Sequence, residues 1–164
     1  MEDPHLLVTS LLDLWRSKCP PGNVPRRAEF DVFTLWPWLG WLTVYEELDD
    51  GADFLVRLDG SKIVALTGDE WTGRRMSELD PWYVTPVLEV LRQAVRGREP
   101  IVDQYYTPAV KDVLTFYRVT LPLSWHSASL RLLQKLQSRL VHATVSCSKS
   151  PHGGTSLRTT IATR

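Results

Sequence analysis

The run from Phe54 to Leu79 constrains the fold of this chain most strongly. It begins with FLVRLD, in which Phe54, Val56 and Leu58 alternate with their neighbours in the period-two pattern of a half-buried strand. Asp59-Gly60 then predicts a turn, since glycine accepts a positive φ without strain. Further glycines at 68 and 73 predict short turns and helices in place of one long helix. The run therefore predicts a strand followed by short covering segments, which can form one wall of a cavity.

Periodic patterns elsewhere predict the remaining elements of the domain. Apolar residues at helical spacing indicate two helices, and alternating stretches indicate a hairpin and two further strands. These elements are expected at residues 5–18 (helix), 41–46 with 53–58 (hairpin), 83–96 (helix), 101–107 and 113–123 (strands). Their order predicts an α+β domain with one antiparallel sheet and helices on one face.

Several short motifs occur in a characteristic order along the chain. They are Pro25-Arg26-Arg27, Glu29-Phe30-Asp31, Arg57-Leu58-Asp59-Gly60, Thr72-Gly73 and Leu121-Pro122-Leu123. In order and spacing these motifs resemble the PAS-domain superfamily, and within it a bacterial PAS-like family, over residues 6–124. The resemblance implies a sensory or protein-interaction module with no established chemistry. It also implies an N-terminal flanking helix and a sheet of five strands, of which the patterns identify four.

The charge distribution changes abruptly near Ser124. Residues 1–124 hold 13 Lys/Arg against 19 Asp/Glu, whereas residues 125–164 hold six Lys/Arg and no acid. This change marks a boundary near residue 124, and Cys19-Pro20-Pro21-Gly22-Asn23 ends the first helix. Together with the resemblance, these boundaries predict a helix and linker (1–22), a PAS-like domain (23–124) and a basic, Ser/Thr-rich tail (125–164). Within the tail, leucine spacing predicts a helix over 127–142, followed by a disordered end.

Three interpretations of the tail remain open. It can be a frame-altered or lineage-specific extension, a basic arm for anionic partners, or a linker helix. The fifth strand of the sheet should also follow residue 124. Val141 to Cys147 could supply it, but only after a long connection. If no strand follows, the sheet keeps an exposed edge, which favours aggregation.

The candidate pocket residues are Arg57 and Trp71 of the opening run and Tyr105, Tyr117 and Arg118 of the two later strands. Arg57 either faces a cavity or forms an ordinary ion pair with Asp53 or Glu70. Trp71 either lines the cavity or covers its mouth. Alternation allows Tyr105, Tyr117 and Val119 to face inward, although the sequence does not fix the register of their strands. Arg118 lies where sheet residues reach a PAS pocket. The ligand itself is unknown.

A surface for binding a second copy or another protein is also expected. The resemblance implies that the N-terminal helix can pack in a homodimer, through a stripe formed by Leu7, Leu11 and Leu14. The chain shows no output domain, so a signal would pass to a partner in trans. An alternative function is therefore an interaction-only dimerisation module whose core is filled by its own side chains.

The remaining function classes are disfavoured by what the sequence lacks. No nucleophile elbow, phosphate loop or metal-ligand spacing is present, so neither catalysis nor a metal site is expected. The formal net charge is zero, which offers no argument for nucleic acid or membrane partners. There is no signal peptide pattern, and no apolar run is long enough to span a bilayer. A cytoplasmic location is the default expectation.

Overall fold

The structure, a computed structural model, describes residues 4–108, 113–124 and 138–147. These residues form three α-helices, four short 3-10 turns and five strands. The α-helices are α1 (Pro4–Ser17), α2 (Ser61–Thr67) and α3 (Pro81–Gly97), and the 3-10 turns are η1 (Arg27–Glu29), η2 (Trp36–Trp38), η3 (Asp49–Gly51) and η4 (Met76–Glu78). The strands are β1 (Leu42–Leu48), β2 (Asp53–Leu58), β3 (Ile101–Pro108), β4 (Val113–Ser124) and β5 (Ser138–Cys147).

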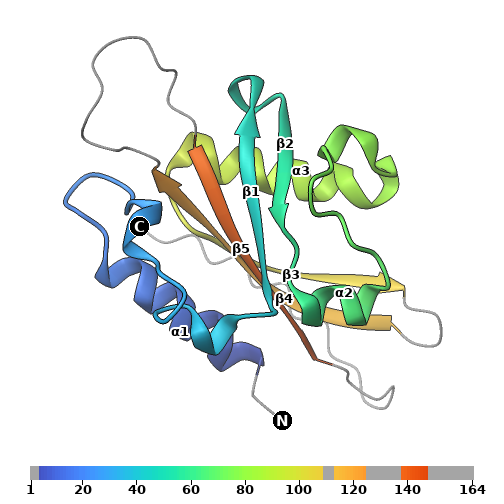
Figure 1. The fold of residues 1–164 in the computed structure, drawn as a ribbon, viewed down its shortest axis with the longest axis horizontal. Coiled ribbons are helices and arrows are strands. Elements are labelled where there is room, and N and C mark those ends of the chain that lie inside the picture. The colour runs from blue at the N-terminus through green and yellow to red at the C-terminus, as the bar shows by residue number, and fades with distance from the viewer. Residues whose placement is uncertain (1–3, 109–112, 125–137, 148–164) are drawn as a thin grey trace.

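All five strands form one antiparallel sheet in the order β2-β1-β5-β4-β3. The last strand in the chain, β5, lies in the middle of the sheet between β1 and β4 (Figure 1). The fold class predicted from the sequence, an α+β domain with a five-stranded antiparallel sheet, is therefore confirmed. The elements predicted between residues 5 and 123 are also present, with bounds shifted by a few residues.

The segment after residue 124 differs from the sequence-based prediction. Residues 138–142 belong to β5, whereas a helix was predicted over 127–142. The boundary at residue 124 thus does not mark the end of the sheet, because β5 pairs with β4 over Ser138–Cys147 and with β1 over residues 139–143. The strand that the sequence analysis held open at 141–147 is the one that completes the sheet. The remainder of the predicted tail helix and the predicted disordered end lie outside the described residues.

The helices divide between the two faces of the sheet. On one face, here called the α1 face, leucines of α1 pack against Leu42, Val119, Leu121 and Leu123. On the other, the α3 face, a second cluster joins sheet residues to η4 and α3; its members include Tyr45, Phe54, Val56, Met76 and Leu91. The expectation of helices on one face therefore holds for the segments after β2, while the N-terminal helix covers the opposite face.

Local chemistry explains where α1 and α3 lie. Proline occupies the first position of α3, and the Asp80 side chain caps this helix by accepting a hydrogen bond from the Trp82 N–H at 3.0 Å. The indole of Trp15 on α1 donates to the Pro122 carbonyl at 2.9 Å. The indole of Trp38 donates to the Leu7 carbonyl at the same distance. Two buried indole N–H groups thus fix α1 against β4 and η2.

Glycine is required at position 60 for steric reasons and not for its backbone conformation. Its φ is −71°, so the predicted positive-φ turn is absent at this position. A Cβ on Gly60 would lie 2.3 Å from the Gly40 carbonyl oxygen and 2.9 Å from the Leu42 carbonyl oxygen. The Gly40 carbonyl in turn accepts hydrogen bonds from the N–H groups of Lys62 and Ile63. Glycine at position 60 therefore lets the start of α2 contact the start of β1.

Candidate functional site

The α3 face of the sheet carries a buried polar group on β4. Alternate β4 residues Tyr117, Val119 and Leu121 belong to the α1-face cluster, so Phe116, Arg118 and Thr120 point to the α3 face. All three of these side chains are buried. The strand register pairs Arg118 with Asp103 of β3 and with Thr144 of β5. The helix α3 packs across this part of the sheet.

Arg118 and Asp103 form a two-point ion pair. The Arg118 Nε donates to Asp103 Oδ1 at 2.6 Å, and its Nη2 donates to Asp103 Oδ2. The arginine side chain is 4% exposed and the aspartate side chain 28%. A buried guanidinium is costly to remove from water, and a bidentate carboxylate is the partner that best offsets that cost. The Arg118 side chain thus lies inside the domain, while the Asp103 side chain reaches solvent.

Thr120 lies one alternate position further along β4. Its Oγ1 is fully buried and finds no hydrogen-bond partner in the part of the chain that the structure describes. Thr43 of β1 shares this face, because both threonines pair in register with position 142 of β5. The Thr43 hydroxyl does have a partner, since it donates to Asp59 Oδ1 at 2.9 Å. The α3 face therefore holds two buried threonines, of which Thr43 has a hydrogen-bond partner and Thr120 has none among the described residues.

Asp59 lies beside Thr43 at the edge of the same region. It accepts hydrogen bonds from Thr43 Oγ1 and, at 3.4 Å, from the Trp71 N–H, while its own N–H donates to Thr72 Oγ1. Burial raises the pKa of this carboxyl above its ordinary value, and the hydrogen bonds from Thr43 and Trp71 partly oppose that shift. The Trp71 ring packs against the α3-side cluster, so this predicted residue lies at the edge of the same region.

The other predicted pocket residues are distributed differently. Arg57 forms an ion pair with Glu46 and is about half exposed. Glu46 lies on the α1 face, and the β1–β2 register brings it opposite Leu55, so Arg57 also points away from the α3 face. Neither of its predicted acidic partners, Asp53 and Glu70, is the one that it contacts. Arg57 therefore forms an ion pair, as one of its two interpretations expected, but with Glu46, and it does not lie with Arg118.

Tyr117 also lies on the face opposite to Arg118. It packs against the α1-face cluster, and its ring meets that of His5 edge-to-face, with centroids 6.2 Å apart and an interplanar angle of 86°. Val119 also faces α1. Tyr105 pairs in register with Phe116, and its side chain lies outside the described residues. Of the five predicted pocket residues, the structure places Arg118 on the α3 face and Trp71 at its edge.

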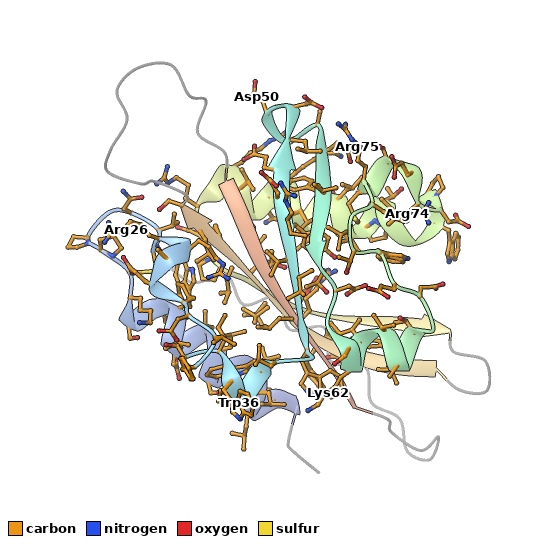
Figure 2. The ribbon with its side chains drawn as sticks, in the orientation of Figure 1. Arg26, Trp36, Asp50, Lys62, Arg74 and Arg75 are labelled. Carbon is orange, nitrogen blue, oxygen red and sulfur yellow. The ribbon has the colours of Figure 1, made fainter. Side chains whose placement is uncertain are left out.

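The predicted dimer stripe lies against the sheet of the same chain. Leu7 is 9% exposed, Leu11 is fully buried and Leu14 is partly buried in the α1-face cluster. The outward side of α1 instead carries Leu6, which is 63% exposed, and Trp36 nearby in the fold is 71% exposed and points away from the sheet (Figure 2). A homodimer through α1 stays a prediction, and these outward residues are the ones available for it.

Comparisons with known proteins give structural neighbours alone. No protein-family model matches the chain, and no curated protein matches it. A domain of an HTR-like protein from Haloarcula marismortui is 13% identical, with a TM-score of 0.42; the match covers 63% of this chain and 97% of that one. A fungal LOV domain photoreceptor is 14% identical, with a TM-score of 0.45 and coverage of 85% and 92%. Similarity at this level supports no inference about ligand or activity.

The architecture itself matches the expectation that the sequence motifs raised. Five antiparallel strands form one sheet, the hairpin β1–β2 leads into short helical segments, and α3 lies across the sheet before β3. The chain has a PAS-like fold. Within the described ranges of this PAS-like domain, no helix combines the length and apolar character that a membrane crossing requires. The same residues bring together no group of three or more His, Cys, Asp or Glu that could hold a metal ion.

Sequence reasoning identified Arg118 but not its surroundings. Asp103, Thr43 and Thr120 were not among the predicted site residues. The signal for Asp103 was available, because residues facing each other across a predicted β3–β4 hairpin include oppositely charged pairs. No pattern in the sequence marks Thr120, since threonine is common on strands and its isolation depends on every neighbour at once.

Proposed function

We propose that this chain is a sensory PAS-like module that binds a small molecule on the α3 face of its sheet, beside Arg118 and Thr120. The observation that carries the proposal is the fully buried Thr120 hydroxyl, which has no partner among the described residues. An unsatisfied buried hydroxyl costs about 1–3 kcal/mol of stability. A ligand that hydrogen-bonds this hydroxyl removes the cost, so the protein with ligand is the more stable form.

The Arg118–Asp103 pair gives the site its chemistry. Arg118 is fixed by its carboxylate partner, so a ligand beside it meets a guanidinium whose orientation is already set, with little further loss of side-chain entropy. Because Asp103 already neutralises the guanidinium, the site favours a polar molecule without net charge. Its apolar surroundings, including Phe116 and the α3-side cluster, favour a ligand with an apolar body.

An interaction-only module is the second candidate function. Phe54, Met76 and Leu91 on the α3 side are fully buried, which favours a core filled by the protein's own side chains. In either case the signal passes through a homodimer or to a partner in trans. Absence of catalysis and a cytoplasmic location stay predictions of the sequence analysis.

Native mass spectrometry of the full-length chain, with a denatured run beside it, tests ligand binding. We expect extra non-covalent mass in the native spectrum that disappears in the denatured one. The mass should be lost when Arg118→Met and Asp103→Leu are combined, since replacing both partners of a buried ion pair by apolar residues is often neutral for stability. The variant Arg57→Gln is the matched control, because Arg57 points away from this face and its removal should leave the bound mass unchanged.

A bare chain contradicts the ligand-binding proposal if it stays bare after incubation with the small-molecule fraction of a cell extract. A bare dimer under these conditions favours the interaction-only module instead. Bound mass that survives in the Arg118/Asp103 variant places the ligand elsewhere.

A further inference from the structure

A second hollow lies away from the α3 face, where the linker after α1 meets the ends of α3 and β4. It has a volume of about 480 Å³, within the range of small-molecule sites. Its lining comes from the linker, η1, the residue after α3 and the last residue of β4: Pro20, Asn23, Val24, Arg26, Glu29, Arg98 and Ser124. None of these residues belongs to the polar group around Arg118, so this hollow is a separate site.

The wall between linker and sheet is fixed by backbone hydrogen bonds. The Ser124 N–H donates to the Pro25 carbonyl at 2.9 Å, and Arg26 forms an isolated parallel bridge with Ser124. Val24, the linker residue before these contacts, is buried. The side chain of Asn23 accepts a hydrogen bond from the Val24 N–H at 2.9 Å. The hollow is therefore part of the folded domain rather than a gap beside a loose loop.

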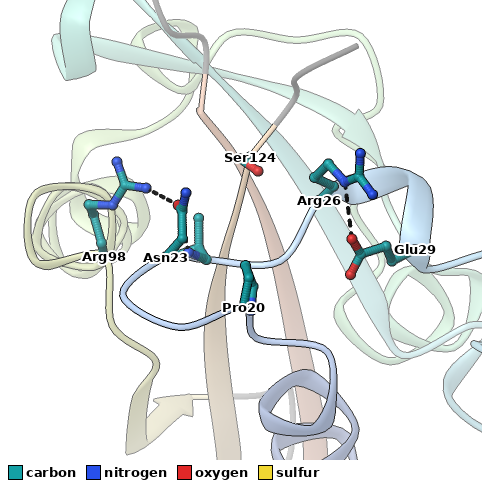
Figure 3. Close-up of a pocket in the computed structure, with 7 residues that line it drawn as sticks. Pro20, Asn23, Arg26, Glu29, Arg98 and Ser124 are labelled. Atoms are coloured by element: carbon teal, nitrogen blue, oxygen red, sulfur yellow. Dashed lines mark hydrogen bonds and ion pairs between the residues drawn. The ribbon is translucent and has the colours of Figure 1, made fainter. Parts of the chain in front are cut away.

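Two guanidinium groups lie on opposite sides of this hollow, with Asn23 and Ser124 between them (Figure 3). Arg98 donates one Nη2 N–H to Asn23 Oδ1. Arg26 Nε donates to Glu29 Oε1 at 3.1 Å. An arginine has five N–H donors, so each guanidinium keeps several that find no acceptor among the described residues. The charged side chains that line the hollow sum to a positive charge, two arginines against one glutamate.

We propose that this hollow binds the carboxylate or phosphate group of a small anionic molecule between Arg26 and Arg98. Guanidinium groups donate paired N–H bonds that match the oxygens of both groups. Asn23 and the Ser124 hydroxyl lie between the arginines and add polar contacts. Bound there, the anion joins the N-terminal linker to the C-terminal end of α3, two segments that are far apart in the sequence.

Glu29 allows a test in which substitutions of neighbouring residues should change the anion affinity in opposite directions. Its carboxylate occupies one donor of Arg26 and repels an incoming anion. Neutralising it should therefore strengthen binding, whereas neutralising either arginine should weaken it. A purely structural role for the Arg26–Glu29 pair predicts the same sign for Arg26→Gln and Glu29→Gln, since both changes remove one ion pair.

The test is a titration of the ¹⁵N-labelled full-length chain with inorganic phosphate and, separately, with acetate, at constant ionic strength set with chloride. We expect saturable shifts of the amide signals of Asn23, Val24, Arg98 and Ser124. Arg26→Gln and Arg98→Gln should each weaken the affinity by about fivefold or more. Glu29→Gln should tighten it, and higher ionic strength should weaken it because the groups are partly exposed. Saturation by phosphate alone identifies a phosphate-bearing ligand, and saturation by both anions identifies an oxyanion site in general.

Arg74→Gln is the control, because Arg74 is an exposed arginine on the far side of the molecule from Arg26 (Figure 2). It should bind phosphate like the unmodified chain. Circular dichroism of each variant establishes that it is folded, and Arg98→Lys, which keeps the charge, replaces Arg98→Gln if the latter unfolds. Shifts that do not saturate with either anion, or affinities that the Arg26 and Arg98 variants leave unchanged, overturn the proposal.

Discussion

Thr43 and Thr120 form a natural pair for comparison at the scale of single residues. Both are buried on the α3 face, but only Thr43 has a hydrogen-bond partner among the described residues. Thr43→Val should destabilise the chain by about 1–2 kcal/mol, because it removes the hydrogen bond that Asp59 Oδ1 accepts from the Thr43 hydroxyl. Thr120→Val should stabilise the ligand-free chain by about 1 kcal/mol, because the shape is kept and an unsatisfied hydroxyl is removed. Urea unfolding measures both.

The sign of the Thr120→Val effect is the informative result. A loss of stability comparable to that of Thr43→Val would show that the Thr120 hydroxyl is satisfied in the folded chain, and the argument for a ligand beside it would fail. The same variant should lose the mass expected in native spectra, so stability and binding should change in opposite directions.

Asp59 makes stability depend on pH. Burial raises the pKa of this carboxyl in the folded chain above its ordinary value of 3.8, so the folded state holds the proton more tightly than the unfolded state. The contribution of Asp59 to stability is therefore fully present below that value and is lost as pH rises through the folded pKa. Asp59→Asn removes this titration.

The measurement is the difference in unfolding free energy between the unmodified chain and Asp59→Asn, followed from about pH 3.5 to about pH 6. We expect the unmodified chain to lose stability relative to the variant as pH increases. A difference that stays constant, or that grows in favour of the unmodified chain, would show that Asp59 is not held in a desolvated position.

At the scale of elements, the contact between α2 and β1 depends on Gly60. A methyl group at this position would lie 2.3 Å from the Gly40 carbonyl oxygen, a backbone atom that cannot rotate away. Gly60→Ala should therefore cost about 2 kcal/mol or more. Gly97→Ala is the matched control: nothing lies within 4 Å of its added carbon, and this residue ends α3. It should be neutral or stabilising by up to about 1 kcal/mol. Equal unfolding midpoints for the two variants would contradict this account of the α2–β1 contact.

Periodicity predicted the helices α1 and α3 and the strands β1 to β4 because each has a strong local pattern. It placed residues 138–142 of β5 in a helix, because the spacing of Leu130, Leu133 and Leu140 also suits a helix, and it left 141–147 open as a strand. From residue 141 onward, Val141, Ala143, Val145 and Cys147 alternate with polar residues, so this half of the strand does carry a local strand pattern. The evidence for β5 is its pairing with distant strands, which a local window does not contain.

The candidate site was only partly predictable for a related reason. Both faces of β4 are buried, so alternation separated Tyr117 and Val119 from Arg118 without indicating which set faces α3. Glu46 pairs with Leu55, and Arg57 lies at a register irregularity between the pairs Tyr45–Val56 and Val44–Leu58, so counting back from the turn does not give the Arg57–Glu46 contact. The Arg118–Asp103 pair likewise depends on register, which periodicity alone does not fix.

At the scale of the whole molecule, β5 joins two halves that would otherwise be separate. The hairpin β1–β2 and the hairpin β3–β4 share no ladder with each other, and both reach the sheet through β5. Thr43 and Thr120 come to lie on one face only because β5 is between their strands. The PAS-like domain, the site beside Arg118 and the proposed sensory role all depend on residues 138–147 being part of the sheet.

Hydrogen exchange of the full-length chain, followed by mass spectrometry, tests this claim most directly. The amides of a strand paired on both sides should exchange only when the domain opens. We expect peptides covering 138–147 to be protected to the same degree as those from β1 and β4. Exchange of 138–147 at the rate of an unstructured chain, with β1 and β4 still protected, would contradict a sheet built around β5.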